Sequence, residues 1–202
     1  LRTDVFDDIH EGANNANNKF TSAASMGVDV NPMYLNTPVD DHISTGASVL
    51  YRIDVTAGET LEIELDAVDD HAANELYVRY EGLPSSMFYD AMHEGHLWAD
   101  QAARVPSTRE GTYYVLVRGQ GGSTPITLTA RTLPFALEDV TPDTGGDDRY
   151  VTMTLRGAKF DPDALVKLVR PQIAEYEAVN YEWIDATEIR AVFDLRDAPH
   201  GL

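Results

Sequence analysis

The sequence predicts an all-β protein made of two tandem β-sandwiches. Helical periodicity is nearly absent, polar and apolar residues alternate with period two in many segments, and Gly-rich turns separate these segments at short spacing. The 202 residues are enough for two cores of modest size. A content of 43% hydrophobic and 9% aromatic residues is that of a globular protein.

The first predicted strand pair lies in residues 49–65. Apolar residues alternate through 49–55 and again through 61–65, with a turn at 56–59 between the two runs. Glu62 and Glu64 fall on the face opposite the apolar residues of the second run. This pattern is typical of an antiparallel hairpin with one buried and one solvated face, and it places both glutamates in solvent.

A second strand pair is predicted in residues 113–130. Residues 113–118 are apolar on almost both faces, which predicts a central strand. Gly119 to Gly122 supplies a turn, and apolar residues alternate again through 126–130. We expect the two runs to be neighbouring strands of one sandwich.

The pattern restarts after Leu133-Pro134-Phe135. Pro134 cannot donate a hydrogen bond to a β-ladder, so it is suited to a linker. The expected division is therefore a leader or the tail of a preceding segment at 1–10, a first sandwich at 11–133 and a second at 134–202. In the second sandwich, strands are expected around 151–155 and 189–193. Truncation of this unit at its C-terminus is left open.

Composition excludes several classes of function. A formal charge of −19 repels phosphate backbones and anionic lipid, so nucleic-acid and membrane-surface binding are not expected. No apolar run is long enough to insert into a membrane. The chain has no cysteine, which excludes disulfides, thiolate metal sites and cysteine nucleophiles.

Catalytic motifs are also missing. His93-Glu94-Gly95-His96 is one residue shorter than the HExxH zinc motif, and Gly95 disfavours the helix that motif needs. There is no G-x-S-x-G elbow, phosphate-binding loop or dinucleotide fingerprint. We therefore expect a protein that is not an enzyme and has no certain cofactor.

One aromatic segment, ELYVRYEGLPSSMFYDA at 75–91, is a candidate contact surface. In a strand, Tyr77 and Arg79 point to the face opposite Leu76 and Val78. On an exposed face this pair would stack against a sugar or a peptide. The alternative, favoured by the usual place of aromatic residues in sandwiches, is packing beneath a loop at 82–89.

Four segments in order resemble the bacterial pre-peptidase C-terminal (PPC) domain. They are EGANNANNKFTSAASMG, VTAGETLEIEL, ELYVRYEGLPSSMFYD and GTYYVLVRG, and together they span most of residues 11–131. The resemblance implies a jelly-roll-like sandwich. This chain has ISTGASVLYRI where many relatives carry Asp-x-Asp, and its paired aspartates lie earlier.

Residues 134–202 resemble the IPT/TIG domain, which has an immunoglobulin-like fold. The similarity rests on Val140-Thr141-Pro142, Gly145-Gly146, VTMTLRGAKF and the terminal Ala198-Pro199-His200-Gly201. The family's usual final strand is absent from the sequence.

The PPC resemblance implies a calcium site at Glu11, Asn14, Asp40 and Asp41. Carboxylate and amide oxygens are the ligands that Ca²⁺ prefers. The alternative is an Asn-rich capped loop with solvated acidic side chains, and both interpretations stay open.

The resemblances imply non-catalytic modules of a large extracellular or surface-displayed bacterial protein. Such modules space or present neighbouring domains of the same chain, with weak binding to extracellular matrix, protein or carbohydrate. The alternative is a C-terminal accessory module of a secreted protease that aids secretion or substrate binding.

Overall fold

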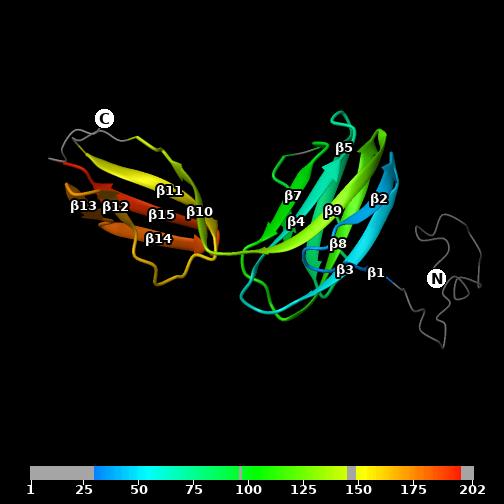
Figure 1. Cartoon of the computed structure of the whole chain (residues 1–202), viewed down its shortest axis with the longest axis horizontal. Helices are drawn as coiled ribbons and strands as arrows, with labels where there is room; N and C mark the ends of the chain where they lie inside the picture. Colours follow the sequence, from blue (N-terminus) through cyan, green and yellow to red (C-terminus); the bar gives the residue numbers. More distant parts are fainter. Residues whose placement is uncertain (1–29, 96, 145–148, 197–202) are drawn as a thin grey trace, which may run out of the picture.

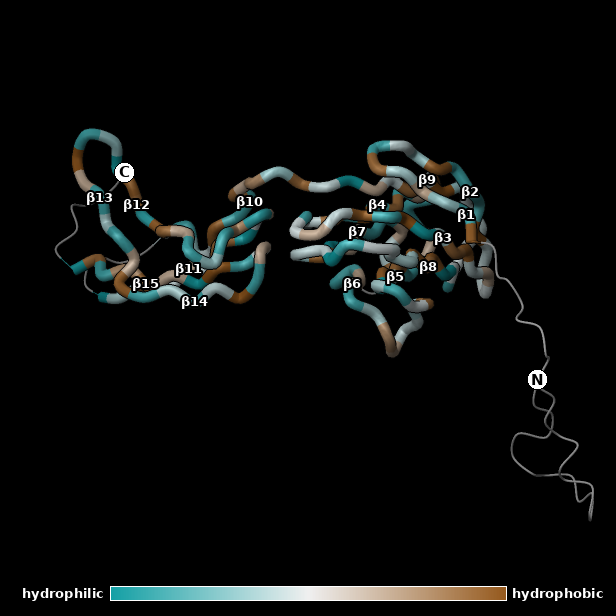
Figure 2. The backbone as a smooth tube through the Cα atoms, turned by 90° about the horizontal axis from the view of Figure 1, so that it is seen from below, coloured by the Kyte–Doolittle hydropathy of each residue, from teal (hydrophilic) through white to brown (hydrophobic). Residues whose placement is uncertain are grey.

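The computed structural model describes residues 30–95, 97–144 and 149–196, all in strands and their connections (Figure 1). The predicted all-β class is confirmed. Two bodies lie along the long axis, and the chain passes once from one to the other (Figures 1 and 2). We call residues 30–133 the first module and residues 136–196 the second module. No described segment forms a helix suited to crossing a membrane.

The first module is a sandwich of two sheets. Alternating apolar side chains from both sheets meet in one continuous core that includes Tyr113, Leu61 and Leu128. One sheet has the order β1 (Asn31–Pro32), β3 (Ser48–Val55), β8 (Gly111–Gly121), β5 (Ala73–Tyr80) and β6 (Ala91–Met92). The other has the order β2 (Val39–Ser44), β9 (Ser123–Leu133), β4 (Thr60–Ala67) and β7 (Gln101–Val105). Strand β8 lies between β3 and β5, as its two apolar faces predict.

The expected hairpin in residues 49–65 and the expected strand pair in residues 113–130 are both wrong. Strands β3 and β4 belong to different sheets, and so do β8 and β9. The turn at 56–59 carries the chain from one sheet to the other. Thr108, in the connection between β7 and β8, stabilises this turn, because its N–H donates to the Glu59 carbonyl at 2.8 Å. Gly122, with a φ of +83°, makes the second crossing between sheets. The alternation is as expected, but the partners of each strand are distant in sequence.

The second module consists of a larger and a smaller sheet. The larger has the order β10 (Ala136–Thr141), β11 (Tyr150–Ala158), β15 (Glu188–Asp194) and β14 (Asn180–Asp185). The smaller pairs β12 (Lys167–Arg170) with β13 (Ala174–Glu177). Met153, Ala191 and Phe193 are buried at the centre, and Leu168 and Tyr176 of the small sheet pack on them. The strands predicted around 151–155 and 189–193 are present as β11 and β15.

Candidate functional site

The two modules are joined by a short connection in the chain. Strand β9 ends at Leu133 and β10 begins at Ala136, so only Pro134 and Phe135 lie between them. The Phe135 ring packs edge-on against buried Phe160 of the second module, with 6.1 Å between ring centroids. A two-residue connection that contacts one of the bodies it joins has little freedom to bend.

A buried carboxylate anchors the first module's side of the junction. Glu62 on β4 is 4% exposed, although its face of the strand was expected to be solvated. Its register partners are Arg104 on β7 and Arg131 on β9. Arg104 Nη2 lies 2.5 Å from Glu62 Oε2, and Arg131 Nη2 lies 2.7 Å from Glu62 Oε1. The two guanidinium groups thus satisfy both oxygens of one carboxylate.

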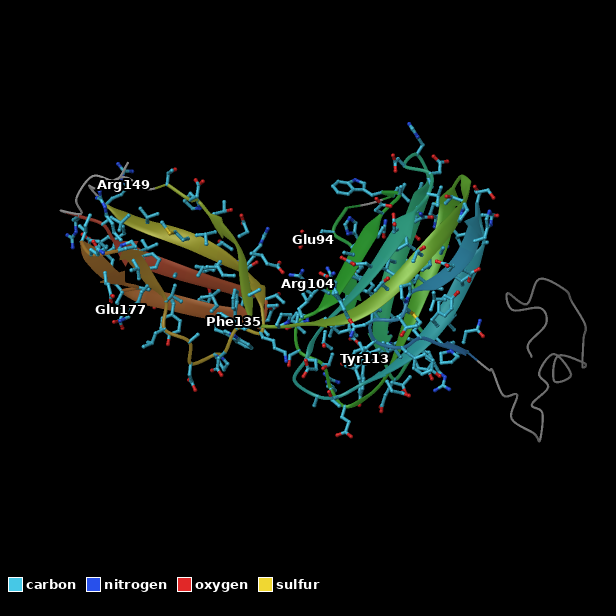
Figure 3. All side chains as sticks on the ribbon, viewed as in Figure 1. Glu94, Arg104, Tyr113, Phe135, Arg149 and Glu177 are labelled. Atoms are coloured by element: carbon cyan, nitrogen blue, oxygen red, sulfur yellow. The ribbon has the colours of Figure 1, made fainter. Side chains whose placement is uncertain are left out.

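The same arginine reaches across to the second module. Arg104 Nη1 donates to Glu138 Oε2 at 2.9 Å and to the Gly157 carbonyl oxygen at 3.2 Å. Glu138 lies on β10 and Gly157 on β11, so the guanidinium contacts two strands of the second module. Figure 3 shows Arg104 on the side of the first module that faces the second. Arg104 is therefore the central side chain of the junction.

A second connection involves Lys159. Its Nζ lies 2.7 Å from Glu59 Oε2, and its backbone N–H donates to Thr60 Oγ1 at 3.2 Å. Lys159 has a φ of +53°, a left-handed conformation that costs a residue with a Cβ about 1–2 kcal/mol. The two contacts with the first module help to offset this cost.

Electrostatics favour the charged form of the network. Burial alone would raise the pKa of Glu62, but hydrogen bonds and charges from Arg104 and Arg131 outweigh burial and hold that pKa below its usual value. Glu62 is therefore ionised at neutral pH, which keeps both arginines in place.

A cleft of about 480 Å³ opens beside this network. Its walls carry His93, Glu94 and Arg104 from the first module, and Arg156, Asp185 and Glu188 from the second. Arg156 Nε lies 3.6 Å from Glu188 Oε2. Within the described ranges, no three His, Asp or Glu side chains gather closely enough to hold a metal ion. Arg104 and Lys159 each pair with a carboxylate of the opposite module, an arrangement suited to aligning two bodies.

The predicted contact residues Tyr77 and Arg79 lie under and beside the loop that follows β5. Tyr77 is 4% exposed, and its ring centroid lies 5.6 Å from that of Tyr89. Arg79 Nη1 donates to the Leu83 carbonyl at 3.2 Å, and its guanidinium lies 5.7 Å from the centre of the Phe88 ring. Burial raises the pKa of Tyr77. Both side chains contact the loop in this conformation.

The predicted calcium ligands are described only in part. Glu11 and Asn14 lie outside the described residues, as does the expected leader at 1–10. Asp40 Oδ1 accepts from Thr127 Oγ1 at 2.9 Å, whereas Asp41 accepts from the Tyr51 hydroxyl and from the His42 N–H. Neighbouring residues of a strand point to opposite faces, so these two carboxylates do not converge. The calcium site stays a prediction.

Comparison with known proteins gives fold-level similarity alone. No protein-family model and no curated protein matches the chain. Among solved structures, the PPC domain of a Bacillus anthracis collagenase covers 54% of this chain and 100% of its own, at 16% identity and a TM-score of 0.43. A periplasmic inhibitor of g-type lysozyme from Aeromonas hydrophila covers 52% and 97%, at 12% identity and a TM-score of 0.39. With TM-scores below 0.5, neither similarity carries an argument about function.

Proposed function

We propose that this chain is a non-catalytic pair of β-modules that holds neighbouring domains of a large extracellular bacterial protein at a fixed spacing and orientation. The first module is proposed to be PPC-like and the second IPT/TIG-like, on the sequence motifs given above. The observation that supports the proposal best is the position of Arg104. One guanidinium contacts Glu62 in the first module and Glu138 and Gly157 in the second.

The geometry suits a semi-rigid spacer. Contacts at three points, through Arg104, Lys159 and Phe135, resist bending in more than one direction, whereas a single contact would act as a hinge. Interfaces between domains of one chain are usually polar, and relative motion is the default where they are small. The charged contacts therefore decide whether the two modules keep one orientation.

The absence of cysteine from the chain makes the proposal straightforward to test. Introducing cysteines at exposed Val68 and Val179 gives one spin label on each module for pulsed electron paramagnetic resonance. We expect a narrow distance distribution in the parent chain and a broad one when Arg104→Ala and Lys159→Ala are combined. A broad distribution in the parent chain would contradict a fixed orientation.

Lys167→Ala is the matched control for the Lys159 substitution. Lys167 lies on β12 of the second module, and its Nζ is 3.8 Å from Glu175 of the neighbouring strand. Removing this lysine changes the net charge by the same amount without touching the junction. The distance distribution should then stay narrow.

A further inference from the structure

A second surface of the first module has the features of a ligand site. Trp98, in the connection between β6 and β7, is 63% exposed. It forms a wall of two adjoining grooves of about 610 Å³ and 480 Å³. Large exposed aromatic rings at the edge of a groove are common contact points in protein recognition. This surface adjoins the junction cleft, since His93 and Ala102 line both, but Trp98 itself takes no part in the Arg104 contacts.

The indole is held in place from behind. The His93 ring lies 5.4 Å from the Trp98 ring, centroid to centroid. A Cβ added to Gly95 would come within 3.0 Å of two Trp98 ring carbons and of His93 Nε2. Glycine at this position therefore lets both rings pack close to the backbone of residue 95. The Trp98 carbonyl accepts from the Asn74 N–H at 3.2 Å, which ties this connection to β5. A ring already fixed in position loses little entropy on binding.

The groups around the ring are acidic. Glu64, Asp66 and Asp100 line one groove, and Asp70 and Asp100 line the other. Among the described residues, neither groove is lined by a Lys or an Arg. Asp100 Oδ1 accepts from the Ala67 N–H at 2.9 Å, which fixes this carboxylate two residues after the indole. Glu64 is paired with Arg131 on a neighbouring strand, whereas Asp66 and Asp70 are exposed.

We propose that Trp98 and these carboxylates bind an arginine side chain of a basic peptide segment on a partner protein. A guanidinium stacks flat on an indole and at the same time donates to a carboxylate, which an ammonium does less well. A sugar also stacks on an indole and donates its hydroxyls to carboxylates, but an uncharged sugar gains little from the negative charges around this ring. The formal charge of −19 adds long-range attraction for a basic partner.

The test uses the two tryptophans of the chain, Trp98 and Trp183. Each gives one indole N–H signal in a nitrogen-15 NMR spectrum, and Trp98→Phe assigns them. The whole chain is titrated with a Gly/Ser peptide carrying two arginines, with its lysine counterpart, and with a citrulline counterpart that keeps the shape without the charge. We expect a saturable shift of the Trp98 signal with the arginine peptide, a weaker response to lysine and none to citrulline. Trp183 should not respond.

Matched variants separate the groove from general charge effects. Trp98→Ala should weaken arginine-peptide binding at least about threefold, the size expected of an exposed cation–π contact. Asp66→Asn should weaken binding more than Glu182→Gln, which removes an equal charge from exposed β14. Thermal melting checks that each variant folds. Equal binding of the citrulline or lysine peptide would overturn the proposal, as would a Trp98 signal that shifts with glycans and not with arginine.

Discussion

Arg104 and Glu138 are joined across the junction by a hydrogen bond of 2.9 Å, and the other side of the same guanidinium contacts buried Glu62. Arg104 therefore links a carboxylate that is fixed in the first module to β10 of the second. An isolated ion pair between exposed side chains contributes little to stability, about 0–1 kcal/mol. Here one partner of the arginine is already fixed by burial and by Arg131, which reduces the entropy lost on forming the pair across the junction.

Replacing Arg104 by alanine should destabilise the first module and loosen the junction together. Glu62 would keep only Arg131 as a charged partner while remaining buried, and we expect a loss of about 1–3 kcal/mol in the free energy of unfolding. Urea denaturation measures this loss when it is followed through the indole N–H signal of Trp98, which lies in the first module. The spin-label distances described above report the loosening.

Glu138→Gln is the companion variant, because it weakens only the contact between modules. The Glu62 network stays complete, so the first module should keep its stability within about 1 kcal/mol. The distance distribution should broaden less than with Arg104→Ala, because the Lys159 and Phe135 contacts remain. If Arg104→Ala destabilises the module but neither variant broadens the distances, the junction does not depend on this arginine.

The first module should also lose stability on acidification because of Glu62. Its pKa is lower in the folded chain than its usual value of 4.5, so the unfolded chain takes up the proton first as pH falls. The stabilising contribution of Glu62 is therefore complete above pH 4.5 and is lost as pH falls through the folded-state pKa. The difference in unfolding free energy between the parent chain and Glu62→Gln should be constant near neutral pH and should shrink below 4.5. A difference that grows on acidification would show that the pKa is raised instead.

Local alternation in the sequence was sufficient to predict an all-β chain but not to predict which strands pair. The segments at 56–59 and 119–122 look like hairpin turns in the sequence. In the structure residues 119–121 extend β8, only Gly122 connects it to β9, and both connections join strands of opposite sheets. A turn signal reports that the chain reverses, but the sheet that the next strand joins depends on contacts distant in sequence. Strand β8, for example, pairs with β3 and β5 rather than with the adjacent β9.

The junction residues were missed for the same reason. Glu62 looked like a solvent-facing residue because its partners Arg104 and Arg131 are 42 and 69 residues away in the sequence. Pro134 lies in the connection between β9 and β10, consistent with the exclusion of proline from the middle of a ladder. No local pattern distinguishes Arg104 from any other arginine of an outward-facing strand position. Its role follows from three contacts that only the folded chain brings together.

Gly157 is expected to be intolerant of any side chain. A Cβ at this position would lie 1.9 Å from the Ala136 carbonyl oxygen on β10, a backbone atom that cannot move independently. Gly157→Ala should therefore separate β10 from β11 and lower the melting temperature of the second module. Gly82→Ala is the control, because its nearest neighbours are atoms of the flexible Arg79 side chain. If the two alanine variants melt alike, the close approach of β10 to Gly157 is not a structural requirement.

A melting experiment decides whether the first module binds calcium. If Glu11, Asn14, Asp40 and Asp41 form a site, millimolar calcium should raise the melting temperature of the first module, because a ligand that binds only the folded state stabilises it. Asp40→Asn should abolish that rise at little cost without calcium, since Asp40 is exposed and an asparagine oxygen still accepts from Thr127. Asp41→Asn is less informative, because Asp41 also accepts from the buried Tyr51 hydroxyl. The same melting temperature with calcium as with a chelator would exclude the site and leave Asp40 as a solvated strand residue.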